Sequence, residues 1–256
     1  MTSTLLEARG VGKRFGGVQA LKDVSITIKQ GEIYGLIGPN GAGKTTFFNV
    51  LTGLYPRDGG EVLFAGAPLN LSSPHEVAKA GIARTFQNIR LFGNMTSLEN
   101  VMVGRHVRTH AGVVGAILRL RSERAEEDAI RRRAEELLHY VGVADRANDL
   151  ARHLSYGDQR RLEIARALAT EPKLLALDEP AAGMNATETA ALRVLIEGVR
   201  NDGLTVLLIE HDVKLVMGLC DRVAVLEYGE KIAEDVPAVV RADPKVIEAY
   251  IGTSAH

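Results

Sequence analysis

The stretch GPNGAGKTT at residues 38–46 constrains the fold most, because it fits the phosphate-loop pattern G-x-x-x-x-G-K-[ST]. It follows directly after the apolar run EIYGLI, which is typical of a strand, and it precedes TFFNVLTG, which is typical of a helix. A loop between a buried strand and a helix presents its backbone amides to phosphate oxygens at the positive end of that helix. The sequence therefore predicts an α/β core that binds a nucleotide.

Each part of this loop has an expected role. The glycines allow backbone shapes that a side chain would block, so that successive amides can turn toward phosphate oxygens. Lys44 supplies a positive charge for the β and γ phosphates, and the hydroxyl of Thr45 is placed to ligate Mg²⁺. The residues expected to bind nucleotide here are Gly38, Pro39, Asn40, Gly41, Ala42, Gly43, Lys44, Thr45 and Thr46.

A second buried strand, LLALDEP at residues 174–180, ends in two carboxylates. Without a phosphate loop, two acids at this place are typical of a cap for the next helix. Beside a phosphate loop, Asp178 is expected to hold Mg²⁺, and Glu179, which points the other way, is expected to polarise a water for attack on the γ phosphate. The sequence thus predicts ATP and Mg²⁺ as cofactors.

Composition excludes several classes of protein. The 256 residues have a formal net charge of -1 and no long run of like charge, so nucleic acid is not expected as a partner. The start of the chain lacks the pattern of a signal peptide, which favours the cytosol. Cys220 is the only cysteine, which excludes an internal disulfide and predicts a small buried side chain. The longest apolar stretches, such as 111–118, are too short to span a bilayer, so any membrane link runs through another protein.

The strand and helix patterns change along the chain. Short β-rich runs near the N-terminus predict a mixed sheet there: 5–10, 24–29, 32–38 and 61–66. A later strand, helix and strand at 174–179, 187–201 and 204–210 predict a parallel sheet covered on both faces. Between them, residues 94–153 are rich in helix formers. Apolar residues recur there at helical spacing, and the segment is expected to be a helical insertion with a solvated charged face: Ile130, Ala134, Leu137 and Val141.

The stretch LSYGDQRRLEIARAL at 154–168 also begins a helix. By itself it is typical of a capped helix start, with Ser155 as N-cap and Asp158 reaching back as in a capping box. Apolar residues predict one buried stripe: Leu162, Ala165, Leu168 and Ala169. The charged residues are expected to lie mostly off it: Arg160, Arg161, Glu163 and Arg166.

Three isolated residues have both an ordinary and a functional interpretation. Gln87 and His211 each follow a strand, where a polar residue usually makes a structural hydrogen bond, but strand ends in this type of fold surround the γ phosphate. Phe15, in KRFGG, is either a core or turn aromatic or a flat surface on which adenine stacks.

Taken in order, Phe15, GPNGAGKT, Gln87, LSYGD, LLALDE and His211 resemble the ATP-binding-cassette ATPases over almost the whole chain. The resemblance implies a phosphate-loop NTPase core with a mixed or parallel sheet, an N-terminal antiparallel β subdomain and an inserted helical subdomain. It implies one domain over 5–254, comprising a core of 5–93 and 154–235, a helical subdomain of 94–153 and a C-terminal helical tail of 236–254.

The resemblance also implies roles for the isolated residues. Phe15 stacks on adenine, Gln87 senses the γ phosphate and touches a membrane subunit, and His211 contacts the γ phosphate. Glu179 activates water. The implied catalytic residues are Glu179, His211, Gln87 and Lys44, and the implied Mg²⁺ ligands are Thr45, Gln87 and Asp178.

LSYGD occupies the position of the family's signature, usually LSGGQ, which completes the ATP site of a second subunit. The resemblance therefore assigns Ser155 and Gly157 to the nucleotide of a neighbouring subunit. Tyr156 replaces a glycine and Asp158 a glutamine, while Asn185 stands where many relatives have aspartate.

Several longer stretches, including GIARTFQNIRLF and the ending DPKVIEAYIG, look more narrowly like an ATPase subunit of branched-chain amino-acid importers. That resemblance implies a second ATPase subunit, identical or related, integral membrane permease subunits, indirectly a solute-binding protein, and a place on the cytoplasmic face of the membrane. The alternatives are another ATP-binding-cassette system, such as lipopolysaccharide export, or uptake of a different amino acid or amide. A switch GTPase would need N-K-x-D, which the chain lacks.

Overall fold

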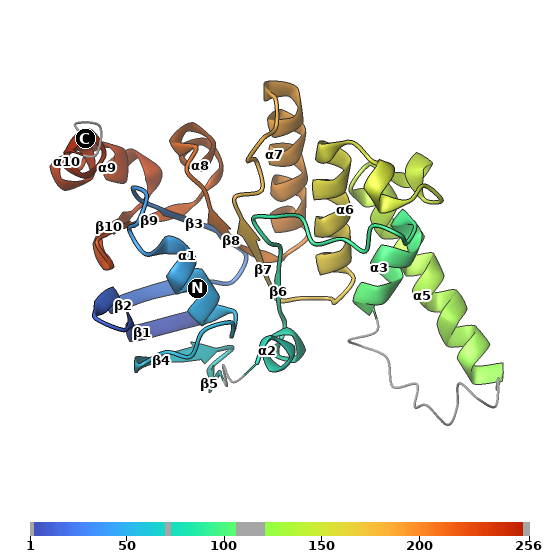
Figure 1. Ribbon diagram of the computed structural model, residues 1–256, viewed down its shortest axis with the longest axis horizontal. Helices are drawn as coiled ribbons and strands as arrows, with labels where there is room; N and C mark the ends of the chain where they lie inside the picture. Colours follow the sequence, from blue (N-terminus) through green and yellow to red (C-terminus); the bar gives the residue numbers. More distant parts are fainter. Residues whose placement is uncertain (1–2, 70–72, 106–120, 253–256) are drawn as a thin grey trace.

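The computed structural model describes residues 3–69, 73–105 and 121–252, and the strands within these ranges form two sheets (Figure 1). The larger has the order β10-β9-β3-β8-β7-β6 and is parallel except for the β9–β10 hairpin. Its strands are β3 (Ile33–Ile37), β6 (Ile82–Arg84), β7 (Leu174–Asp178), β8 (Thr205–Ile209), β9 (Arg222–Glu227) and β10 (Glu230–Asp235).

The smaller sheet is antiparallel, with the order β2-β1-β4-β5. Its strands are β1 (Thr4–Phe15), β2 (Val18–Lys29), β4 (Gly59–Phe64) and β5 (Ala67–Pro68). The antiparallel N-terminal subdomain that the resemblance implies is confirmed. The mixed sheet expected from the four runs is wrong, because the run at 32–38 forms β3 in the larger sheet. The physical reason is that every residue of β3 is buried, with Ile33 and Ile37 in one core and Tyr34 and Leu36 in the other. A strand that is apolar on both faces needs cover on both.

The helices are α1 (Lys44–Leu51), α2 (Pro74–Ala80), α3 (Ser97–Arg105), α5 (Arg121–Tyr140), α6 (Tyr156–Leu168), α7 (Ala186–Asn201), α8 (Val213–Leu219), α9 (Pro237–Ala242) and α10 (Pro244–Gly252). Short 3₁₀ turns lie at Ala144–Arg146 and Ala151–His153. Helices α3, α5 and α6 lie together at one end of the molecule (Figure 1). None of the described helices is long and apolar enough to cross a membrane. The apolar stretch 111–118 lies outside the described residues.

The apolar periodicity of the helical segment is confirmed, since its four recurring residues are all buried: Ile130, Ala134, Leu137 and Val141. Cys220 is buried as expected. The expectation for α6 is partly wrong. Arg160 and Glu163, expected off the buried stripe, have exposed fractions of only 2% and 1%. Their face of α6 is covered by the loop after β6, with whose backbone both side chains form hydrogen bonds.

Candidate functional site

The phosphate loop joins β3 to α1 and depends on glycine at two positions. The backbone at Gly38 has a φ of 149°, and a Cβ added there would lie 2.1 Å from the carbonyl oxygen of Leu226. Gly43 is the N-cap of α1 with a φ of 99°, and an added Cβ would lie 2.7 Å from the carbonyl oxygen of Ala20. The loop can therefore keep this close contact with its neighbours only with glycine at both positions.

Lys44 begins α1 and points back over the loop that precedes it. Its buried ammonium donates to the carbonyl oxygens of Gly38 at 2.6 Å and Pro39 at 2.9 Å. Burial lowers the pKa of Lys44, and the negative charge of Glu179 acts in the opposite direction. The lysine is thus placed by its own loop, within the electrostatic reach of the acid after β7.

A cavity of about 610 Å³ lies against the phosphate loop, within the range typical of small-ligand sites. It is lined by Val18, Gln19, Ala20, Lys22, Asn40, Gly41, Ala42, Gly43, Lys44, Thr45, Thr46, Gln87, Glu179 and Tyr228. The structure therefore brings most of the loop residues expected to bind nucleotide together with Gln87 and Glu179, although these come from distant parts of the sequence.

Asp178 ends β7 and is buried, with an exposed fraction of 3%. Its carboxylate lies 3.7 Å from the guanidinium of Arg84 on the neighbouring strand β6. Burial raises the pKa of Asp178 to about 6, while Arg84 lowers it and Glu179 raises it further. Burial outweighs the ion pair here, so the carboxylate is costly to ionise without a further cation.

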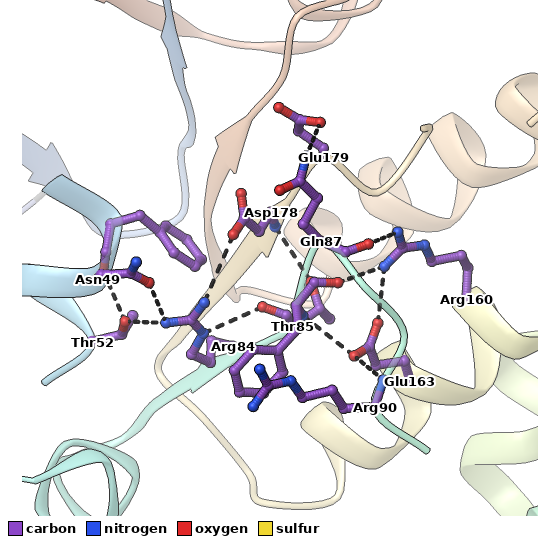
Figure 2. Close-up of polar contacts among 12 residues, drawn as sticks. Asn49, Thr52, Arg84, Thr85, Gln87, Arg90, Arg160, Glu163, Asp178 and Glu179 are labelled. Atoms are coloured by element: carbon purple, nitrogen blue, oxygen red, sulfur yellow. Dashed lines mark hydrogen bonds and ion pairs between the residues drawn. The ribbon is translucent and has the colours of Figure 1, made fainter. Parts of the chain in front are cut away.

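Glu179 follows Asp178 with a φ of 46°, in the left-handed region, and its side chain lines the cavity. The amide nitrogen of Gln87 donates to its carboxylate at 2.8 Å, as Figure 2 shows. Nδ1 of His211 lies 3.6 Å from the same carboxylate oxygen. The three residues expected to act at the γ phosphate are therefore neighbours, arranged around the oxygen of Glu179.

Each residue expected to ligate Mg²⁺ has an oxygen atom that can act as the ligand, and oxygen suits this hard cation. Thr45 contributes a hydroxyl, Asp178 a carboxylate, and Gln87 the amide oxygen, since its amide nitrogen is used by Glu179. Within the described residues, no group of three or more His, Cys, Asp or Glu could hold a metal alone. The donor set fits an ion that takes its remaining ligands from phosphates and water.

Phe15 lies at the end of β1 and is half-exposed. Its ring packs edge-on against Tyr55, with ring centroids 5.3 Å apart, and its cross-strand partner Val18 lines the cavity. Phe15 itself is not among the described residues that line the cavity. Its role as an adenine platform stays a prediction.

Ser155 caps α6, since its hydroxyl accepts from the backbone amide of Asp158 at 3.2 Å. The role of Ser155 as N-cap is confirmed. The carboxylate of Asp158, however, lies 3.6 Å from the guanidinium of Arg161, which is not the arrangement that a capping box requires. A Cβ at Gly157 would lie 2.9 Å from a carboxylate oxygen of Glu188, at the start of α7. Neither Ser155 nor Gly157 is among the described residues that line the cavity.

Several residues at or near the site were missed by the sequence argument, including Val18, Gln19, Ala20 and Lys22 of the cavity lining. Exposed Tyr228 lines the cavity from the β9–β10 turn, where Gly229 donates to the carbonyl of Ala42 at 3.0 Å. Buried Glu210 accepts from the amide of Ala181 at 2.8 Å. Arg84 contacts Asp178. The only available signal was their place beside a strand end, which many residues share.

Two family models match the chain. The model described as ABC transporter matches residues 21–182, and the model described as Branched-chain amino acid ATP-binding cassette transporter matches residues 230–256.

Curated relatives resemble nearly the whole chain. The chain is 45% identical over 253 residues to the high-affinity branched-chain amino acid transport ATP-binding protein LivG of Escherichia coli (strain K12), covering 98% of this chain and 99% of LivG. Over the same shares, it is 42% identical to BraF of Pseudomonas aeruginosa, whose name describes the same transport. It is 34% identical to the lipopolysaccharide export system ATP-binding protein LptB of Escherichia coli (strain K12), covering 96% of this chain and 97% of LptB.

Solved structures share the fold. The ADP conformation of MJ1267, an ATP-binding cassette of an ABC transporter, has a TM-score of 0.85 and 33% identity and covers 98% of this chain and 100% of its own. A dimeric post-hydrolysis structure of the cassette MJ0796, bound to ADP and Pi, has a TM-score of 0.77 and 28% identity, covering 91% and 99%.

Proposed function

The chain belongs to the ABC transporter ATPases, so it binds and hydrolyses ATP, and we propose that it drives uptake of branched-chain amino acids as the ATP-binding subunit of an importer. One observation supports this most directly. A phosphate-loop cavity that includes Gln87 and Glu179 occurs in a chain similar to LivG over 98% of its length.

In the proposed mechanism the loop amides and Lys44 hold the phosphates. Mg²⁺, when bound by Thr45, Asp178 and Gln87 together with the nucleotide, would neutralise phosphate charge. The carboxylate of Glu179 takes a proton from the attacking water, and its hydrogen bond from Gln87 and the nearby His211 keep it at the γ-phosphate end of the cavity. Phe15 supplies a flat surface for adenine.

The proposal includes a dimer in which Ser155 and Gly157 complete the ATP site of the second subunit. Ser155 and Tyr156 are exposed at the start of α6, where the helix N-terminus is able to attract an anion. The dimeric structure of MJ0796 supports this arrangement by similarity. The second subunit is either another copy of this chain or a related one.

The partners would be integral membrane permease subunits and, through them, a solute-binding protein. In this arrangement the chain sits on the cytoplasmic face of the membrane, and Gln87 with the helical segment 94–153 faces the permease. Boundaries for the core at 5–93 and 154–235, and for the tail at 236–254, are part of the same proposal.

Purification of a tagged copy from solubilised membranes tests this function. We expect membrane subunits to co-purify and the complex, placed in liposomes with its solute-binding protein, to take up leucine, isoleucine or valine when ATP is supplied. A matched complex with Glu179→Gln controls for leakage. If the complex hydrolyses ATP but transports none of these amino acids, the proposal that branched-chain amino acids are its substrate is refuted.

Lipopolysaccharide export is the alternative function, because LptB is also similar. The match of residues 230–256 to the branched-chain amino acid family model favours import. Co-purification with lipopolysaccharide-binding membrane subunits would reverse this preference.

A further inference from the structure

Two buried charged residues of α6, Arg160 and Glu163, hold the loop that carries Gln87 (Figure 2). The guanidinium of Arg160 donates to the carbonyl oxygen of Phe86 at 2.6 Å and also to that of Gln87. The backbone position of Gln87 is therefore set by a side chain that lies 73 residues further along the chain.

Glu163 completes this attachment. Its carboxylate accepts from the backbone amides of Phe86 at 3.3 Å and Arg90 at 3.4 Å, and it pairs with Arg160 at 3.2 Å. Among the described residues, no backbone partner bonds to these groups of the loop after β6, so the two side chains supply the hydrogen bonds that its backbone needs. These hydrogen bonds join the loop to α6, so that a displacement of the loop is transmitted to the helix.

The same guanidinium also reaches the signature stretch LSYGD. It donates to the hydroxyl of Tyr156 at 3.0 Å, and the Tyr156 ring lies beside Gly183, where an added Cβ would be 3.3 Å from the ring. A glycine at position 156 would offer no such hydroxyl. Arg160 thus contacts the Gln87 carbonyl and the Tyr156 hydroxyl at the same time.

We propose that Arg160, paired with Glu163, is a positioning residue that links Gln87, in the ATP site of its own subunit, to the LSYGD stretch that serves the ATP site of the second subunit. The link rests on the proposed dimer. A shift of the Gln87 loop when ATP binds is passed through one guanidinium to Tyr156, so that occupation of one site favours occupation of the other. Such coupling between two sites is a reciprocal free energy.

Tyr156→Phe tests the link, because it removes one hydroxyl from a half-exposed ring and leaves the phosphate loop intact. Tyr140→Phe is a matched control: its hydroxyl bonds to Asp202 at 2.6 Å, on a similarly exposed ring away from the signature. The first measurement is amide hydrogen exchange of residues 154–160 in subunits kept monomeric by dilution, with and without MgATP. We expect ATP to change exchange there in the wild type and in Tyr140→Phe, and not in Tyr156→Phe.

The second measurement is ATP hydrolysis by the membrane complex. We expect a Hill coefficient above 1 in the wild type, with an upper limit of about 2 for two sites, and a value near 1 in Tyr156→Phe. The Kd of the isolated subunit for ATP stays unchanged. Equal exchange responses in wild type and Tyr156→Phe, or a wild-type Hill coefficient of 1, overturn the link. If only amino-acid transport fails, the proposed substrate is wrong, but the hydrogen-exchange result still supports the link.

Discussion

The amide of Gln87 donates a 2.8 Å hydrogen bond to the carboxylate of Glu179, so the side chain expected to sense the γ phosphate holds the one expected to activate water. The contact joins the loop after β6 to the end of β7. Any shift of Gln87 therefore changes the position or the hydrogen bonding of Glu179, and under the proposed mechanism hydrolysis is expected to be sensitive to the loop.

Glu179→Gln and Lys44→Ala are expected to have separable defects. Glu179→Gln keeps MgATP binding and lowers the turnover rate roughly a hundredfold or more, because the base is lost. Lys44→Ala weakens MgATP binding, because the phosphates lose a positive charge. The measurements are the Kd for MgATP and the hydrolysis rate of the assembled transporter. Normal hydrolysis by Glu179→Gln would exclude its catalytic role.

Phe15→Ala is expected to raise the Kd for ATP about fivefold, equivalent to about 1 kcal/mol of lost stacking, and Phe15→Trp to leave it nearly unchanged. Since Phe15 also packs on Tyr55, Tyr55→Ala is the control. Equal increases in Kd for Phe15→Ala and Tyr55→Ala would show that packing, and not stacking on adenine, is responsible. Fluorescence titration with ATP measures all three.

Mixed dimers test whether LSYGD acts on the neighbouring subunit. A Ser155→Arg subunit paired with a Lys44→Ala subunit keeps one intact composite site, whereas a wild-type subunit paired with the double mutant keeps none. We therefore expect more ATP hydrolysis from the first pair, in complexes with matched membrane subunits. The opposite ranking would mean that each LSYGD serves its own subunit or only caps its helix.

The Mg²⁺ requirement is expected to depend on pH through Asp178. Because the pKa of Asp178 is raised to about 6, protons displace the metal as the pH falls through this value. The Mg²⁺ concentration for half-maximal MgATP binding should rise about tenfold for each pH unit below about 6. Asp178→Asn controls for titration of ATP itself: the wild type should depend more steeply on pH than this variant, and equal slopes would contradict the assignment.

Arg160→Met is expected to lower the free energy of unfolding by about 3–5 kcal/mol, because it leaves the carboxylate of Glu163 buried without its partner. Adding Glu163→Leu should recover part of this loss by removing the unpaired charge. Urea unfolding of the wild type, Arg160→Met, Glu163→Leu and the double variant measures the difference. A double variant that is less stable than Arg160→Met by the full cost of a second independent change would show that the pair is not coupled.

The phosphate loop and the strands beside it could be predicted because their signals are local. The loop is recognisable within nine consecutive residues, and the apolar runs that became β3, β7 and β8 are buried throughout. The pairing of strands is not local. Whether the run at 32–38 joined the first sheet or the second depended on which partners could cover both of its faces.

The charged residues of α6 could not be placed from the sequence, because a helical pattern assigns charges to solvent by default. What buries Arg160 and Glu163 is a loop more than 70 residues away in sequence. Arg84 is similar: burial lowers its pKa to about 10, and its guanidinium lies 4.6 Å from the ring centroid of Phe48 and 4.4 Å from that of Phe86. Tyr228 reaches the cavity only because its turn packs on the phosphate loop.

The central position of β3 has a consequence for synthesis of the protein. Its neighbours in the sheet are β8 and β9, with Leu36 opposite Ala224, and Gly229 donates to Ala42 of the phosphate loop. The ribosome makes the phosphate loop well before β8 and β9, so the strand that carries the loop has no neighbour in its sheet until these later strands have emerged. The nascent chain must therefore protect a strand that is buried throughout in the folded protein until β8 and β9 arrive, and a ribosome that stops before β8 releases a product with no complete nucleotide site to stabilise it.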